Sequence, residues 1–234
     1  MSPQKFLQST VRLAAGAAGA AAGMYGAYAA ATWVRYGHPA APGEADRDPL
    51  LDRFMPVYEV VERHAIRIDA PADATFDAAR QADLFDAPLV RAIFKGRELL
   101  LGAAAGGRSG RRGLLAEVQA LGWLVLAENP GREVVVGAVT KPWEANVTFR
   151  GVPPERFASF AEPGFVKIAW TLRADPDGSG GSIFRTETRA VATDADARAR
   201  FRRYWAFLSP GIILIRRASL AVVKADAERQ RPAA

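Results

Sequence analysis

The chain has 234 residues, of which 50% are hydrophobic and 24% charged, and this is the composition of a globular protein. It contains no cysteine and only two histidines, His38 and His64. This excludes disulfides, thiolate metal sites and a cysteine nucleophile, and it leaves little material for a zinc site or a histidine-based triad. We therefore expect no bound metal, and no motif in the sequence predicts a cofactor.

The net charge of +6 is concentrated at the two ends of the chain. Residues 1–37 carry +3 and residues 193–234 carry +5, whereas residues 38–192 carry −2. A basic protein favours an anionic partner, either a nucleic acid or a membrane surface. Because the basic residues flank an apolar segment at one end and lie on a terminal helix at the other, their placement favours a membrane surface over a nucleic acid.

Residues 13–34 are uncharged and rich in alanine and glycine. As a helix, these 22 residues would span about 33 Å, enough to cross the apolar core of a bilayer. We predict that residues 1–37 form a single-pass membrane anchor, with a cleaved signal peptide and a soluble alanine-rich helix as alternatives. Two basic residues precede the span and two follow it, so the distribution of positive charge does not decide on which side of the membrane the rest of the chain lies. Residues 38–56, broken by proline and glycine, predict a solvated linker.

The body of the chain begins with a predicted strand and two helices. Residues 58–69 alternate between apolar and charged side chains, with His64 on the apolar face, and this pattern predicts a half-buried strand. Pro71 suits the first turn of the helix that follows, where its missing N–H costs nothing. A second helix is expected at residues 87–101, and a glycine-rich loop at residues 102–113.

Strands fill the middle of the chain. The sequence predicts them at residues 123–128, 133–139, 144–150, 165–173 and 183–192. The first two flank Pro130-Gly131, the signature of a type II turn, because glycine tolerates the positive φ that this turn requires. In the last strand Thr186 and Thr188 share an apolar face, and we expect the opposite, charged face, which includes Arg189, to be solvated.

A long helix is predicted at the end of the chain. Thr193 is expected to cap its first turn, and apolar residues recur at helical spacing over residues 201–208. The arginines at positions 198–203 are expected on a solvated face or beside anionic lipid headgroups. Pro210-Gly211 predicts a kink or an interruption.

The order of these elements resembles the START-like helix-grip superfamily (SRPBCC), which includes polyketide cyclases and dehydrases and lipid-transport-like proteins. Two steps carry the resemblance: Ala70-Pro71, from the first strand into a helix, and Thr193-Asp194, from the last strand into the long helix. The resemblance implies an α+β fold over residues 57–231, with a curved antiparallel β-sheet around the long C-terminal helix. It also implies a mostly apolar cavity between them, and it carries over no catalytic residue.

Seven side chains are candidates to line this cavity and bind a ligand: His64, Trp143, Trp170, Thr186, Thr188, Tyr204 and Leu208. The polar ones could orient the polar end of a ligand, and the aromatic and aliphatic ones could form the wall. Ordinary core packing is the alternative for each of them.

The leading hypothesis is a domain that binds a hydrophobic small molecule or lipid in this cavity without catalysis, tethered to a membrane at its N-terminus. The first alternative is an enzyme, of the cyclase, dehydratase or hydrolase type, that uses the same cavity and needs His64 or a buried carboxylate with a shifted pKa to face it. The second is a membrane-surface interaction protein that uses the basic C-terminal helix. The sequence leaves the ligand and the oligomeric state open.

Overall fold

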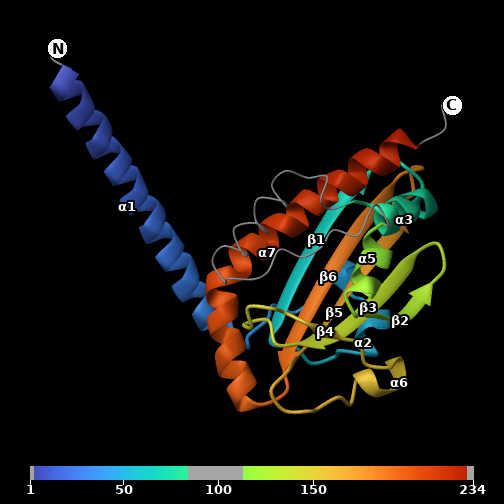
Figure 1. Cartoon of the computed structure of the whole chain (residues 1–234). Coiled ribbons are helices and arrows are strands. Elements are labelled where there is room, and N and C mark those ends of the chain that lie inside the picture. Colours follow the sequence, from blue (N-terminus) through green and yellow to red (C-terminus); the bar gives the residue numbers. More distant parts are fainter. Residues whose placement is uncertain (1–2, 84–112, 231–234) are drawn as a thin grey trace.

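One antiparallel sheet forms the centre of the protein. The computed structural model describes residues 3–83 and 113–230, and within them six strands form one sheet in the order β1-β6-β5-β3-β2, with β4 beside β3 (Figure 1). The strands are β1 (Val60–Ile68), β2 (Leu124–Asn129), β3 (Glu133–Thr140), β4 (Phe149–Arg150), β5 (Val166–Pro176) and β6 (Ser182–Ala192).

Helices lie on both sides of this sheet, and the longest crosses one face of it (Figure 1). They are α1 (Pro3–Arg35), the short 3₁₀ helix η1 (Glu44–Asp46), α2 (Pro49–Asp52), α3 (Ala72–Gln81), α5 (Leu114–Ala120), α6 (Pro154–Phe157) and α7 (Ala195–Arg229). The expected α+β helix-grip architecture, a sheet packed against a long C-terminal helix, is confirmed.

The sheet has an inner face and an outer face, and each carries its own part of the core. On the inner face, α3, α5 and α7 pack against the strands in one cluster that includes Phe76, Leu115 and Val223. On the outer face, α2 and α6 pack in a second cluster that includes Leu51 and Phe157. Because both faces are covered, all eight residues of β3 are buried.

Most predicted strands are confirmed to within a few residues. The turn between β2 and β3 has Gly131 at φ 72°, as a type II turn requires. The strand expected at 144–150 shrinks to Phe149–Arg150, because β3 ends at Thr140, where it pairs with Phe149, and offers no partner to the earlier residues. The helix expected at 87–101 lies outside the described residues, as does nearly all of the loop after it.

The sequence reasoning missed α5 and misplaced one cap. Helix α5 has only seven residues and follows a glycine-rich stretch, so its short periodicity was not recognised. The cap of α7 is Asp194, whose carboxylate accepts hydrogen bonds from the N–H groups of Asp196 and Ala197 at 2.8 and 2.9 Å. The hydroxyl of Thr193 instead donates to the carbonyl of Phe165, which joins the helix start to β5.

Helix α7 is continuous but bent. Figure 1 shows its first part running in a different direction from the rest, which lies along the sheet. Pro210 lies inside the helix and has no N–H to donate to the preceding turn, so a bend at this point follows from the sequence. The expected kink is therefore present, and an interruption is not.

The prediction that the charged face of β6 is solvated was wrong. Residues 49–55, part of the segment expected to be a solvated linker, pack over this outer face and bury Leu51 and Met55. Arg189 is only 1% exposed and donates hydrogen bonds to Glu187 and to the carbonyl of Met55. A charged face can be buried in this way when each charge meets a partner.

The prediction of an N-terminal membrane anchor was also wrong. Among the described residues, the helix long and apolar enough to cross a bilayer is α7, at the other end of the chain, and α1 does not qualify. Alanine and glycine add little hydropathy per residue, so the absence of charge over 13–34 does not make a membrane span. Helix α7 lies against the sheet, and a core helix of a folded domain can share its length and composition.

Candidate functional site

A cavity of about 560 Å³ lies between the inner face of the sheet and helix α7. Most of its wall is apolar or aromatic, and α5, β5, β6 and α7 contribute to it. The larger apolar side chains in this wall are Leu114, Val118, Leu121, Trp123, Phe149, Trp170, Leu172, Phe184, Phe207, Leu208, Ile212, Ile215, Leu220 and Val223. Pro210 and Gly211 also line it, so the bend of α7 forms part of the cavity.

A second hollow of about 190 Å³ adjoins the first. The two share six lining residues: Trp123, Phe149, Trp170, Tyr204, Ile212 and Arg216. The smaller hollow is the more polar of the two, because Glu62, Thr140 and Thr188 also line it. The site is therefore one space with a large apolar part and a smaller part that contains polar groups.

The register of the strands places polar side chains of the smaller hollow next to each other. Glu62 of β1 pairs with Thr188 of β6, and Thr188 pairs in turn with Trp170 of β5. Because side chains of neighbouring strands in register point to the same face, these three form one row across the inner face. Arg216 faces this row from α7 and lines both hollows.

Two polar atoms in this space are buried and have no hydrogen-bond partner in the part of the chain that the structure describes: Nε of Arg216 and Oγ1 of Thr188. Burial lowers the pKa of Arg216 to about 10, against the opposing charge of Glu62, so the guanidinium stays cationic at neutral pH. Burial also raises the pKa of Glu62, while Arg216 and Arg217 lower it. The smaller hollow is thus lined by a guanidinium whose buried Nε–H donor has no partner among the described residues.

Five of the seven candidate residues line the two hollows: Trp170, Thr186, Thr188, Tyr204 and Leu208. Trp143 lines neither of them and instead packs beside Phe201 and Tyr36 in a separate cluster. Arg216, Glu62 and Trp123 were not among the candidates. A carboxylate on the apolar side of β1 and an arginine pair inside the apolar run of α7 are the signals that could have indicated Glu62 and Arg216.

His64 also lines neither of the two hollows under α7. Its Nε2 lies 3.6 Å from Oε2 of Glu62 and has no hydrogen-bond partner within the described ranges. Burial, together with the charges of Arg216 and Arg217, lowers the pKa of His64 and keeps the ring neutral at pH 7. His64 therefore sits beside the polar end of the site and not in its wall.

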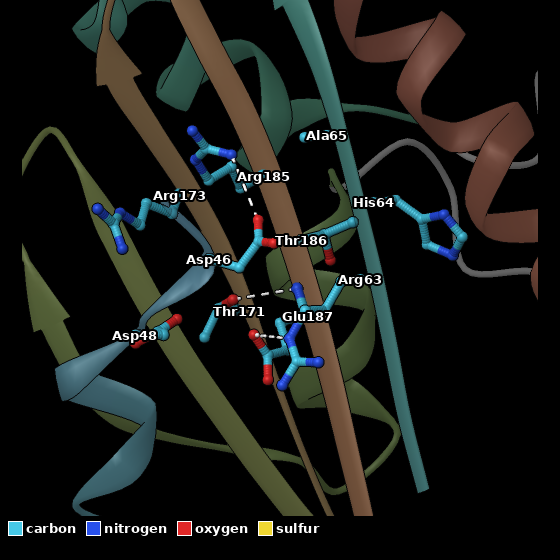
Figure 2. A pocket seen from close by; sticks show the side chains of 10 residues that line it. All are labelled: Asp46, Asp48, Arg63, His64, Ala65, Thr171, Arg173, Arg185, Thr186 and Glu187. Carbon is cyan, nitrogen blue, oxygen red and sulfur yellow. Dashed lines mark hydrogen bonds and ion pairs between the residues drawn. The ribbon is translucent and has the colours of Figure 1, made fainter. Parts of the chain in front are cut away.

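A third hollow, of about 210 Å³, lies on the outer face of the sheet (Figure 2). Three arginines and three carboxylates surround it, and Arg63 pairs with Glu187 at 3.0 Å while Arg185 lies 3.7 Å from Asp46. Figure 2 shows the ring of His64 directed away from these groups, toward α7. The balanced charges join the η1–α2 segment to the sheet, which is a structural role.

The described residues contain no group of three or more His, Asp or Glu side chains placed to hold a metal ion. No family model matches the sequence, and no curated protein matches it.

Solved structures with a similar arrangement include the Zhui aromatase/cyclase from Streptomyces sp. R1128. It is 15% identical, covers 74% of this chain and 96% of its own length, and has a TM-score of 0.28. CalU16 from Micromonospora echinospora is 14% identical, with coverages of 72% and 96% and a TM-score of 0.25. A protein from Nitrosospira multiformis is 14% identical, with coverages of 74% and 100% and a TM-score of 0.35. These values are too low to transfer a ligand or a residue's role to this chain.

Proposed function

We propose that this chain belongs to the helix-grip superfamily and binds a hydrophobic small molecule or lipid between its sheet and α7. The observation that carries the proposal is the cavity of about 560 Å³ with its mostly apolar wall. Sites for small molecules have this size and character, with a few polar groups that orient the ligand. Each Å² of apolar surface removed from water contributes about 25 cal/mol, so a ligand of matching shape gains affinity from the wall alone.

Aromatic side chains make part of this wall rigid. Trp123 lies with its ring centroid 5.0 Å from that of Phe149 and 6.1 Å from that of Trp170. Such contacting rings lose little conformational freedom when a ligand binds, since they are already packed against each other. The two tryptophans also provide a fluorescence signal for occupancy of the cavity.

The position of His64 weakens one form of the enzymatic alternative, because its ring lines neither hollow under α7. The other form needs a buried carboxylate, and Glu62, whose pKa burial raises, is the carboxylate in the wall of the smaller hollow.

The contacts of α7 leave the interaction-protein alternative with less support. Arg198 pairs with Glu59, and Arg202 donates to the carbonyl of Trp33 at 2.7 Å, so these arginines already serve contacts within the chain.

Filling the cavity tests the proposal. Leu208→Trp adds an indole to the cavity wall, whereas Leu214→Trp adds the same group at a position of α7 that is 45% exposed. We expect Leu208→Trp to weaken the binding of 1-dodecanol at least tenfold, measured by calorimetric titration, and Leu214→Trp to leave it unchanged. Thermal unfolding of both variants checks that they fold, since overpacking costs about 1–3 kcal/mol. Equal binding by the two variants would overturn the proposal.

A further inference from the structure

We infer that the ligand carries an anionic head group, such as a carboxylate, which Arg216 and Thr188 bind in the smaller hollow while the apolar part of the ligand occupies the larger one. This inference rests on the proposed function and names the ligand class of the same site. Four observations support it: the unused donor of Arg216, the surrounding charges, the unused hydroxyl of Thr188 and the division of the cavity.

Arg216 is a half-buried cation whose buried Nε has no close anion among the described residues. Its Nε has no hydrogen-bond partner, and among the described residues the carboxylate whose charge acts on it is that of Glu62, outside ion-pair distance. Leaving a buried charge unpaired costs several kcal/mol, so proteins almost always give such a group a partner. Arg189 on the outer face has two carboxylates and a carbonyl around it. An anionic group of the ligand would supply the partner that Nε of Arg216 lacks.

The charges around the smaller hollow select an anion over a cation. Arg216 and its neighbour Arg217 are cationic, while Glu62 is the carboxylate that faces them from β1. The pKa of His64 is lowered, so its ring adds no charge at neutral pH. The balance at this end of the site is therefore positive, which favours a carboxylate and disfavours an ammonium group.

Thr188 supplies a second group for the same head. Its Oγ1 is buried and has no hydrogen-bond partner among the residues that the structure describes, and it lines the smaller hollow together with Arg216. A carboxylate accepts hydrogen bonds at two oxygens, and these two donors could satisfy both. The larger hollow, with Leu208, Ile212 and Leu220 in its wall, then receives the hydrocarbon part.

The experiment compares dodecanoate with 1-dodecanol, which share their hydrocarbon chain and differ in charge. The full-length protein is titrated with each by calorimetry at pH 7.5. We expect dodecanoate to bind at least tenfold more tightly, since a charge-assisted hydrogen bond contributes more than a neutral one. Arg216→Met should remove this preference, so that dodecanoate and 1-dodecanol bind to the variant within about twofold of each other. The matched control Arg203→Met, at an exposed position of α7 that lines neither hollow, should retain the preference.

Thr188→Val preserves the shape of its side chain and gives a second test, with an expected loss of about threefold or more for dodecanoate alone. Equal binding of the two probes to the unmodified protein, or an unchanged preference in both Arg216→Met and Thr188→Val, would overturn the head-group inference. In that case continued binding of 1-dodecanol would keep the proposed function intact. Failure of both probes to bind would overturn the cavity proposal itself, and with it this inference.

Discussion

The two faces of the sheet treat buried charge in opposite ways. On the outer face Arg189 is 1% exposed and contacts Glu187 at 2.7 Å, with Asp52 and the carbonyl of Met55 as further partners. On the inner face Nε of Arg216 has no hydrogen-bond partner within residues 3–83 and 113–230. The charge of Arg189 therefore stabilises the fold, whereas the Nε–H donor of Arg216 is free to bind a ligand.

Other arginines of the outer face follow the same rule as Arg189. Nε of Arg173 and of Arg185 lack hydrogen-bond geometry, but they lie 2.8 and 3.5 Å from Oδ2 of Asp175. Arg63 donates to Glu187 and to the hydroxyl of Tyr58. A paired network of this kind stabilises the contact between the η1–α2 segment and the sheet, and it leaves no unmatched charge for a ligand.

The largest change in the free energy of unfolding is expected when the paired Arg189 is replaced. Arg189→Met would leave the carboxylate of Glu187, which is 5% exposed, with one partner fewer in a buried position. Breaking a buried pair from one side costs about 3–5 kcal/mol, and we expect the free energy of unfolding in urea to fall by this amount. A loss below 1 kcal/mol would contradict the structural role assigned to the outer face.

A smaller effect is expected from Glu133 on the outer face, where burial first and then the nearby Asp48 raise the pKa to about 7. Between pH 4.5 and pH 7 the folded protein keeps this proton and the unfolded chain releases it, so stability falls as the pH rises through this window. We expect a loss of about 2–3 kcal/mol across it, from about 1.4 kcal/mol per pKa unit.

Urea unfolding at several pH values measures this dependence. Glu133→Gln cannot ionise and keeps the shape of the side chain, so its stability should decline less over the same window than that of the unmodified protein. Parallel pH profiles for the two proteins would show that Glu133 does not contribute.

The smallest change in the free energy of unfolding is expected when Arg216, which faces the inner side of the sheet, is replaced by methionine. Arg216→Met removes a cation whose buried Nε has no close partner among the described residues, so the free energy of unfolding should stay the same or rise by about 1 kcal/mol. The measurement is the urea unfolding used for Arg189→Met, so the same change is compared at a paired arginine of β6 and at Arg216 of α7. If Arg216→Met destabilised the protein as much as Arg189→Met, the contrast between the faces would be lost.

Much of the fold could be predicted from local sequence patterns. Alternation predicted β1, β5 and β6, and Pro130-Gly131 predicted the turn that joins β2 to β3. Failures occurred where the pattern was short, as in α5, or where a partner strand ended, as beside β4. The prediction of a membrane anchor was wrong because residues 13–34 lack charge but are not hydrophobic enough to cross a bilayer.

The residues of the candidate site were harder to predict from the sequence than the fold. Trp170, Thr188 and Leu208 were placed on the correct faces by periodicity, and they line the hollows. Glu62 was not among the candidates, because nothing in its own segment indicates Arg216 opposite it. The two residues are 154 positions apart in the sequence, and their meeting depends on how α7 crosses β1.

The sequence by itself determined which residues form strands and helices, where α7 bends and which side chains share a face. These properties depend on neighbours within a few positions, so periodicity and turn residues suffice to specify them. Only the tertiary structure decided that residues 49–55 cover the charged outer face and that the inner face leaves a cavity with an unpaired arginine. Burial and pairing depend on segments distant in the chain, and the cost of an unpaired buried charge can be recognised only when all its neighbours are in place.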